Sequence, residues 1–414
     1  MTAREAEDYL LGLELFGMRF GLDRMRRLMT ALGMPQHRYA QIHVVGSNGK
    51  SSTVRFIAAI LERHGLSTGS YTSPHLRSFR ERIEVAEEPL REERFAAAVE
   101  RVARAAELVD RVLEPDDGVT QFEALTAAAY HELALRKVEV GVIEAGLGGR
   151  HDATNVIPSR VQVLTGVELE HTRWLGPTVA DIAEEKLAVV RHHATLVVGE
   201  LGPDARAVAE RVTRERAARL VQAPPAIADL RMRARGHFQR RNFALAATAA
   251  EAFLGRRLDP HATRRAAAET RVPGRLEVVA RQPITIYDGA HNPAGALALA
   301  EALPAVTEER RPLVAVLSVL EDKDAAGMLA ALLPLADHVV LTRCANPRSL
   351  SPATLETLAS KLGAGSTEIV SDPRDAVERS RALAGPHGAV AVTGSIYLIA
   401  DLVRDDGQRR VSSL

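Results

Sequence analysis

Cysteine is nearly absent from this sequence of 414 residues, in which Cys344 is the only one. A single thiol cannot form an internal disulfide or a cysteine-based metal cluster, so a disulfide-stabilised secreted scaffold is excluded. The first ten residues, MTAREAEDYL, also lack the basic start and the apolar stretch of a secretory signal. We therefore expect the protein to work in the reducing environment of the cytoplasm.

Long apolar runs and an excess of charge of one sign are missing as well. No segment offers the roughly 18 uninterrupted apolar residues that a membrane span requires. The 53 basic and 53 acidic residues give a formal net charge of zero, so the chain lacks the net positive field that generic nucleic-acid binding uses. The sequence predicts neither a membrane nor a nucleic acid as a partner.

Lysine is scarce. Five of the 53 basic residues are lysines, which leaves 48 arginines; the lysines are Lys50, Lys137, Lys186, Lys323 and Lys361. A lysine kept against this bias indicates chemistry that needs a compact ammonium or a reactive amine, which a guanidinium cannot replace. Lys50, Lys186 and Lys323 all fall in the motifs described below.

The chain is long enough for two compact domains, and its pattern predicts two α/β units. Short apolar strands alternate with helical periodicity, which is typical of parallel sheets covered by helices. The first series is expected at 42–45, 69–71, 138–143, 161–167 and 195–198, and the second at 284–287, 313–317, 338–341, 368–370 and 389–392. We place the boundary within 267–274, where a helical stretch ends in VPG.

The segment GSNGKSS at 46–52 follows a predicted strand and opens a predicted helix. Gly46 and Gly49 allow tight turns, so that backbone amides and the positive end of the helix can surround a polyphosphate. Lys50 would bridge phosphate oxygens, and Ser51 or Ser52 offers a hydroxyl to Mg²⁺ or phosphate. The strict Walker pattern needs a glycine where Val44 stands, and the alternative is a glycine-rich turn with an exposed lysine.

Three polar side chains follow predicted strands of the first series: Ser73, Glu144 and His171. The carboxyl ends of parallel strands share one edge of a sheet, so these residues are expected to converge near the phosphate loop. Such oxygen-rich coordination suits Mg²⁺, with water and phosphate completing the shell. The alternative is three unrelated, solvated loop residues.

The motifs together resemble the folylpolyglutamate synthase and dihydrofolate synthase family, within the Mur ligase superfamily. The matching segments cover nearly the whole chain. They are FGLDRM at 20–25, IHVVGSNGKSSTV at 42–54, YTSPHL at 71–76, RERI at 80–83, FEALT at 122–126, EAGLGGRHDATN at 144–155, EHTRWLG at 170–176, IAEEK at 182–186, PGRLE at 273–277, YDGAHNPAG at 287–295, SVLEDKD at 318–324 and VTGSIYL at 392–398.

The resemblance implies a P-loop ATPase domain with a parallel sheet at 1–272 and a smaller Rossmann-like C-terminal ligase domain at 273–414. It also implies roles for residues by their place in the motifs. The ATP-binding set is Gly46, Ser47, Asn48, Gly49, Lys50, Ser51, Ser52, Asn242, Arg275 and Asp288; the metal set is Ser73, Glu144 and His171; the folate-binding set is Phe20, Gly21, Leu22, Phe122, Glu123 and Asp152; and the catalytic set is Lys50, Lys186 and His291.

The implied activity is ATP-dependent addition of L-glutamate to a folate through an acyl phosphate. The acceptor is tetrahydrofolate, dihydropteroate, or both. The resemblance further implies two Mg²⁺ ions, one of them placed by a carbamate formed on Lys186 with CO₂, and a monomer is expected because two domains can enclose the site. Against the family's usual GTNGKGS this loop has Ser47 and Ser51, and Glu170 replaces the usual aspartate before the metal histidine.

Two other functions stay open at this point. A Mur-type UDP-muramoyl amino-acid ligase would use the same loop and the same intermediate, although FGLDRM and FEALT argue against it. A nucleotide-regulated binding protein could use the strand-end residues only as a switch. For Lys186 itself, the alternative is a surface lysine paired with Glu184, Glu185 or a neighbouring carboxylate on the same helix.

Overall fold

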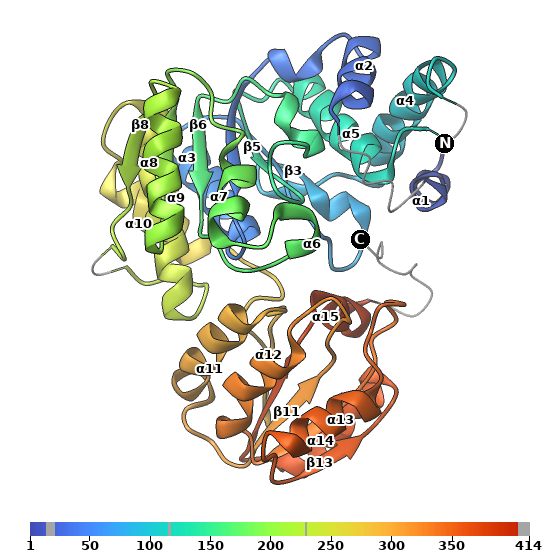
Figure 1. Ribbon diagram of the computed structural model, residues 1–414, viewed down its shortest axis with the longest axis vertical. Coiled ribbons are helices and arrows are strands. Elements are labelled where there is room, and N and C mark those ends of the chain that lie inside the picture. Colours follow the sequence, from blue (N-terminus) through green and yellow to red (C-terminus); the bar gives the residue numbers. More distant parts are fainter. Residues whose placement is uncertain (14–20, 115–116, 228–229, 405–414) are drawn as a thin grey trace.

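The computed structural model describes residues 1–13, 21–114, 117–227 and 230–404. Two α/β units follow one another along the chain, and Figure 1 shows them as an upper body in blue to yellow and a lower body in orange to red. Each unit is built on its own sheet. The predicted α/β class with two parallel-rich sheets is confirmed.

The first sheet has six adjacent parallel strands and two antiparallel strands at one edge. In their order across the sheet they are β4 (Glu88–Pro89), β3 (Ile83–Val85), β2 (Thr68–Tyr71), β5 (Val140–Glu144), β1 (Ala40–Val45), β6 (Val161–Leu164), β7 (Thr195–Val198) and β8 (Arg219–Gln222). The antiparallel pairs are β2 with β3 and β3 with β4.

Helices cover this sheet on both faces. They are α1 (Ala3–Gly12), α2 (Asp23–Ala31), α3 (Lys50–Arg63), α4 (Glu92–Asp110), α5 (Gln121–Leu135), α6 (Thr172–Leu175), α7 (Val179–Leu187), α8 (Pro203–Glu215), α9 (His237–Leu254) and α10 (Pro260–Glu269). Strand β7 shows why both faces are buried: Val197 joins the core under α3 and α9, whereas Leu196 and Val198 join the core under α7 and α8. Sheets with two covered faces need such continuous apolar strands.

The second sheet has the order β13 (Thr367–Ile369), β12 (His338–Leu341), β11 (Leu313–Leu317), β14 (Ala389–Thr393), β10 (Ile284–Tyr287) and β9 (Glu277–Arg281). All neighbours are parallel except β10 and β9. Its helices are α11 (Pro293–Thr307), α12 (Ala325–Leu332), α13 (Pro352–Lys361), α14 (Pro373–Ala384) and α15 (Ile396–Val403). Alternate residues of β11 face α11 and α12 on one side and α14 and α15 on the other.

Several predicted boundaries were wrong. Strand β6 ends at Leu164, not at 167, because the chain turns there toward the phosphate loop, where Gly166 O accepts a hydrogen bond from Ser47 N (3.0 Å). Glu144 lies inside β5 and does not follow it. Strands β3, β4, β8 and β9 were not predicted. The connection between α10 and β9 contains the predicted boundary at 272/273, which stays a prediction.

Among the helices of the described ranges, none combines the length and the apolar character that a membrane span requires.

Candidate active site

The phosphate loop connects β1 to α3, and two glycines fix its path. Gly46 has φ 144°, and a Cβ there would collide with Oγ1 of Thr165. Gly49 has φ 83°, and a Cβ there would lie 2.6 Å from Oδ1 of Asn242 in α9. Only glycine accepts this backbone at so close an approach. Asn242, implied as a nucleotide contact, therefore does lie beside the loop.

Lys50 begins α3 and bends back over the loop. Its Nζ donates to the carbonyl oxygens of Gly46 (2.9 Å) and Ser47 (3.1 Å). The hydroxyl of Ser47 accepts from the amide of Glu168 (3.0 Å), so the loop is also tied to the segment after β6. A lysine at the positive end of a 14-residue helix gives the loop a strong attraction for phosphate.

Ser51, Ser73 and Glu144 form one hydrogen-bonded group beside the loop. Ser51 Oγ donates to Oε1 of Glu144 (2.9 Å), and the Ser73 amide donates to Oε2 (3.2 Å). Glu144 is 1% exposed, and burial raises the pKa of its carboxyl while Lys50 opposes the rise. Ser52 is directed elsewhere, because it accepts from Nε2 of Gln239 (3.2 Å). Of the two candidate hydroxyls, Ser51 is the one that faces the carboxylate.

His171 reaches the same region from the loop before α6, where its backbone is left-handed (φ 50°). Its Nε2 lies 3.3 Å from Nζ of Lys323, which belongs to the second unit. Burial, reinforced by Lys323, lowers the pKa of His171 to about 4, so the imidazole is neutral at pH 7 and can accept this hydrogen bond.

The residues fit a hard divalent cation in part. Ser51, Ser73 and Glu144 supply hydroxyl and carboxylate oxygens, which Mg²⁺ prefers when phosphate and water complete its shell. The Nε2 lone pair of His171 faces Lys323, so it can bind a metal only after that ammonium moves away. Within the described ranges, three His, Cys, Asp or Glu side chains are nowhere grouped as a metal site by themselves.

Lys186 in α7 is buried beneath the loop and is 1% exposed. Its Nζ donates to Gly46 O (3.0 Å) and to Oε1 of Glu170 (3.2 Å). The alternative of a surface ion pair on its own helix is wrong, because Glu185 pairs with Arg150 and Glu184 with Arg211. Burial lowers the pKa of the Lys186 amine to about 8, against the opposing effect of Glu170.

Asp288, His291 and Arg275 cluster at the carboxyl end of β10. Asp288 is 4% exposed, and its carboxylate accepts from the amides of Leu276 (2.8 Å) and Ala290 (2.8 Å). Nη1 of Arg275 donates to Gly289 O (2.8 Å). Burial, with Lys323 and Arg275 close by, lowers the pKa of His291 to about 4. Asp288 and His291 lie in the turn that follows β10, and Arg275, which precedes β9, braces this turn through Gly289 O.

Polar contacts at the site join this turn and its unit to the first unit. The side-chain amides of Asn48 and Asn292 pair reciprocally, at 3.2 and 3.0 Å, and Lys323 meets His171. Neither Asn292 nor Lys323 was predicted as a site residue. Lys323 carried a signal in the scarcity of lysine, and Asn292 followed His291 within the same motif.

The residues implied for the folate lie around the loop after β5. The carboxylate of Asp152 accepts from the amides of Leu147 (2.8 Å) and Thr154 (3.0 Å). The ring of Phe122 fills the space beside Gly146, where a Cβ would come within 2.6 Å of it. These contacts hold the loop after β5 in place.

Glu123, Gly21 and Leu22 lie further along the same side. Glu123 caps the start of α5 and accepts from Nε of Arg24 (3.2 Å) in α2. Leu22 precedes α2 and is buried, with Gly21 just before it. Phe20 lies outside the described residues.

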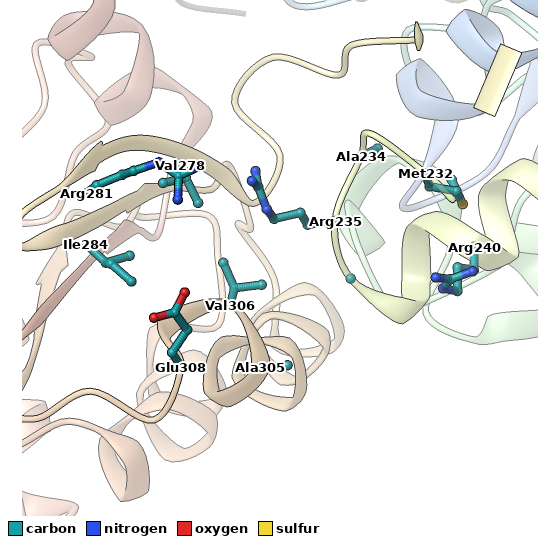
Figure 2. Close-up of a pocket in the computed structure, with 11 residues that line it drawn as sticks. Met232, Ala234, Arg235, Arg240, Val278, Arg281, Ile284, Ala305, Val306 and Glu308 are labelled. Atoms are coloured by element: carbon teal, nitrogen blue, oxygen red, sulfur yellow. The ribbon is translucent and has the colours of Figure 1, made fainter. Parts of the chain in front are cut away.

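A cavity of about 340 Å³ lies elsewhere between the units, and Figure 2 shows Arg281 on one side of it, Arg240 on the other and Arg235 between them. The segment before α9 and the first turn of this helix form one wall, and β9, β10 and the end of α11 form the other. Its lining residues are Met232, Ala234, Arg235, Gly236, Arg240, Val278, Arg281, Ile284, Ala305, Val306 and Glu308. None of the predicted site residues is among them.

Known proteins with similar sequences define the class of this protein. Residues 274–396 match the family described as "Mur ligase, glutamate ligase domain". The dihydrofolate synthase/folylpolyglutamate synthase of Mycobacterium tuberculosis is 35% identical over 401 residues, which are 87% of this chain and 82% of that protein. The chain therefore belongs to the folylpolyglutamate synthase and dihydrofolate synthase family of ATP-dependent ligases, and the resemblance in its motifs is confirmed.

Solved structures agree over nearly the full length. Mycobacterium tuberculosis folylpolyglutamate synthase complexed with ADP superimposes with a TM-score of 0.90 at 33% identity, covering 97% of each chain. An Escherichia coli structure in complex with DHPP and ADP gives a TM-score of 0.86 at 28% identity, again covering 97% of each chain.

Proposed function

We propose that this ligase adds L-glutamate to a folate acceptor at the place where the phosphate loop meets the second unit. The observation that carries the proposal is the contact of Asn48 with Asn292 beside Lys50, Ser51 and Glu144. ATP held by the loop would then lie against the turn that contains Asp288. A relative named for both synthase activities, and the structure that contains DHPP with ADP, support a folate as acceptor.

The proposed chemistry starts from a carboxylate, which forms only a salt with an amine at neutral pH and must be activated. A carboxylate oxygen of the acceptor attacks the γ-phosphorus of ATP, the bond to the leaving oxygen breaks, and ADP departs. The neutral α-amine of glutamate attacks the resulting acyl phosphate. Phosphate leaves, the amine gives its proton to solvent, and the amide remains.

The chain's own groups would act mainly by charge and position. Lys50 and the first turn of α3 would offset negative charge on the transferring phosphoryl group. Holding the acceptor in line could lower the barrier by about 7–11 kcal/mol. Asn242, Arg275 and Asp288 would hold the nucleotide, and His291 lies next to them at the seam.

Mg²⁺, when bound, would supply neutralising charge on the phosphates. Ser51, Ser73 and Glu144 would hold it, with His171 joining once Lys323 has moved. A second ion is proposed near Lys186, where a carbamate would replace the ammonium that now pairs with Glu170. Folate would lie along Phe20 to Leu22, Phe122, Glu123 and Asp152.

We also propose that residues 1–272 and 273–414 act as the two domains of a cytoplasmic monomer. Support for the monomer comes from the site itself, because one chain supplies both the phosphate loop and the turn opposite it.

The proposal is tested by ADP release measured with dihydropteroate and, separately, with tetrahydrofolate as acceptor. ADP release that depends on both glutamate and an acceptor is expected, and the panel assigns the acceptor. ADP release at the same rate with and without glutamate would instead indicate a nucleotide-hydrolysing binding protein.

Asp288→Ala should weaken ATP binding by about 10-fold or more, since hydrogen bonds involving a charged group contribute about 1.5–3 kcal/mol. It should also lower the free energy of unfolding, because the carboxylate accepts two buried amides. Calorimetry with ATP and thermal unfolding measure both effects. Asp372→Ala removes a carboxylate that caps α14 far from the loop, so it should lower stability and leave ATP binding unchanged. An ATP dissociation constant unchanged in Asp288→Ala would contradict the contact.

A further inference from the structure

Arg82 is a fully buried arginine whose two terminal nitrogens, Nη1 and Nη2, have no anionic partner among the described residues. It ends the 3₁₀ turn Phe79–Arg82 just before β3 and is 1% exposed. Its Nε donates to Nδ1 of His75 (3.0 Å), whereas Nη1 and Nη2 are both buried without a hydrogen-bond partner in the described part of the chain. Burying unpaired guanidinium N–H groups is costly, and buried arginines are normally paired with an anion.

The surroundings of Arg82 do not supply that anion. Glu144 is close enough to act on it electrostatically, but the two oxygens of this carboxylate accept from Ser51 and Ser73. The phenols of Tyr71 and Tyr397 also act on it, and the Tyr71 hydroxyl is close enough for a weak hydrogen bond with the guanidinium. The ring of Phe79 lies 5.4 Å from the guanidinium carbon.

Arg82 also lies near the interface between the two units. Its carbonyl accepts from the amide of Thr72 (2.9 Å), which anchors the loop that carries Ser73. Leu76, at the end of this loop, packs beside Gly274 and Ile399 of the second unit. A Cβ on Gly274 would lie 3.1 Å from the Leu76 side chain and 3.5 Å from the Ile399 side chain. Tyr397, which is close enough to act electrostatically on Arg82, belongs to α15 of the second unit.

We propose that Arg82 is the binding site for a non-reacting carboxylate of one of the two carboxylate-bearing substrates, an inference that rests on the proposed function. Its two Nη groups present parallel N–H donors, the arrangement that binds a carboxylate through both oxygens. Because Tyr397 and Arg82 are on different units, movement of α15 away from β3 opens the space that the carboxylate needs. Arg82 lies beside the Ser73 and Glu144 group, so a substrate held there has its reacting end near the phosphate loop.

Two substrates carry such a carboxylate. Free glutamate has its α- and γ-carboxylates, and a glutamylated folate has the α-carboxylate of its last residue. Dihydropteroate carries only the carboxylate that reacts. A loss of glutamate affinity with both acceptors would place glutamate at Arg82, and a loss confined to tetrahydrofolate would place the acceptor there.

The test compares Arg82→Lys, which keeps the positive charge and loses the paired donors, with Arg80→Lys as control. Arg80 lies on the same turn and donates to Leu90 O (3.0 Å). Arg82→Lys should raise the KM of glutamate or of tetrahydrofolate by about 10- to 100-fold, the usual effect of losing a charged hydrogen bond. The KM of ATP should change by less than about 3-fold, and Arg80→Lys should leave every KM near the wild-type value.

Unchanged KM values for glutamate and tetrahydrofolate in folded Arg82→Lys would overturn the inference. So would a parallel change of kcat and of all KM values, ATP included, together with a lower Tm, because that pattern marks a purely structural role. If the variant does not fold, the wild-type structure with ADP, glutamate and tetrahydrofolate decides. A carboxylate oxygen within hydrogen-bonding distance of Nη1 or Nη2 supports the site, and its absence there rejects it.

Failure of the proposed function is distinguishable from failure of this inference. Wild-type protein that releases no ADP with either acceptor would contradict the proposed function. Calorimetric binding of glutamate and of tetrahydrofolate to wild type and Arg82→Lys then tests Arg82 without turnover, and equal affinities for both ligands would reject the carboxylate site.

Discussion

Lys50→Ala is expected to lower kcat by about 100- to 1,000-fold, the range seen when one preorganised donor to a developing charge is removed. The ammonium lies over the phosphate loop, and its hydrogen bonds within the described part of the chain go to the carbonyls of Gly46 and Ser47. It is therefore placed for phosphate charge and contributes little to packing. The free energy of unfolding should change by no more than about 0.5 kcal/mol, as for a partly exposed side chain outside the core.

The measurements are glutamate-dependent ADP release at saturating substrates and chemical denaturation. Lys361→Ala provides the control, because Lys361 is an exposed lysine at the end of α13 and has no part in the site. Near-normal turnover in folded Lys50→Ala would show that the loop does not bind the transferred phosphate. Equal losses in both variants would point to a general effect of removing positive charge.

The strands of the two sheets could be predicted wherever the sequence has an apolar run. Strand β11 is buried on both faces and all of its residues are apolar, so its pattern is visible, and in β1 the mostly apolar run 42–45 gives the same signal despite the buried His43. Strand β3 was missed because its segment is charged: Glu84 is buried there and is compensated by Arg55 at 2.7 Å. That compensation comes from α3, and local sequence does not reveal it.

The candidate site likewise contains residues that local sequence predicts and contacts that it does not. Ser73 and Glu144 could be brought together from sequence, because both lie at the carboxyl end of neighbouring parallel strands. The pairs Asn48 with Asn292 and His171 with Lys323 join residues separated by 244 and 152 positions. They depend on how the two units meet, which no local pattern encodes. The same holds for Arg82, because its burial without a carboxylate partner for Nη1 and Nη2 among the described residues appears only in three dimensions.

The burial of Lys186 lowers the cost of forming a carbamate on its amine. A lysine amine must be neutral to attack CO₂. For an ordinary lysine, with a pKa near 10.4, deprotonation at pH 7 costs about 4–5 kcal/mol. Burial lowers the pKa of Lys186 to about 8, which reduces this cost to roughly 1.4 kcal/mol at about 1.36 kcal/mol per pH unit. The product would be an anion next to Glu170, so a cation must compensate it, and Mg²⁺ bound near the loop would do so.

Lys186→Arg is therefore expected to lower ligase turnover by about 1,000-fold or more, since placing a catalytic cation contributes several kcal/mol. Arginine keeps the charge that pairs with Glu170 but cannot form the carbamate. The larger side chain must fit a buried position, which could cost about 1–3 kcal/mol of stability, so thermal unfolding and ATP binding are measured alongside turnover.

A second experiment leaves the protein unchanged. Wild type in CO₂-free buffer should lose activity and regain it with bicarbonate, and ¹³C-bicarbonate should give a carbamate signal that is absent from Lys186→Arg. Activity independent of CO₂, together with near-normal turnover in the arginine variant, would leave Lys186 as a buried ion-pair partner of Glu170 and nothing more.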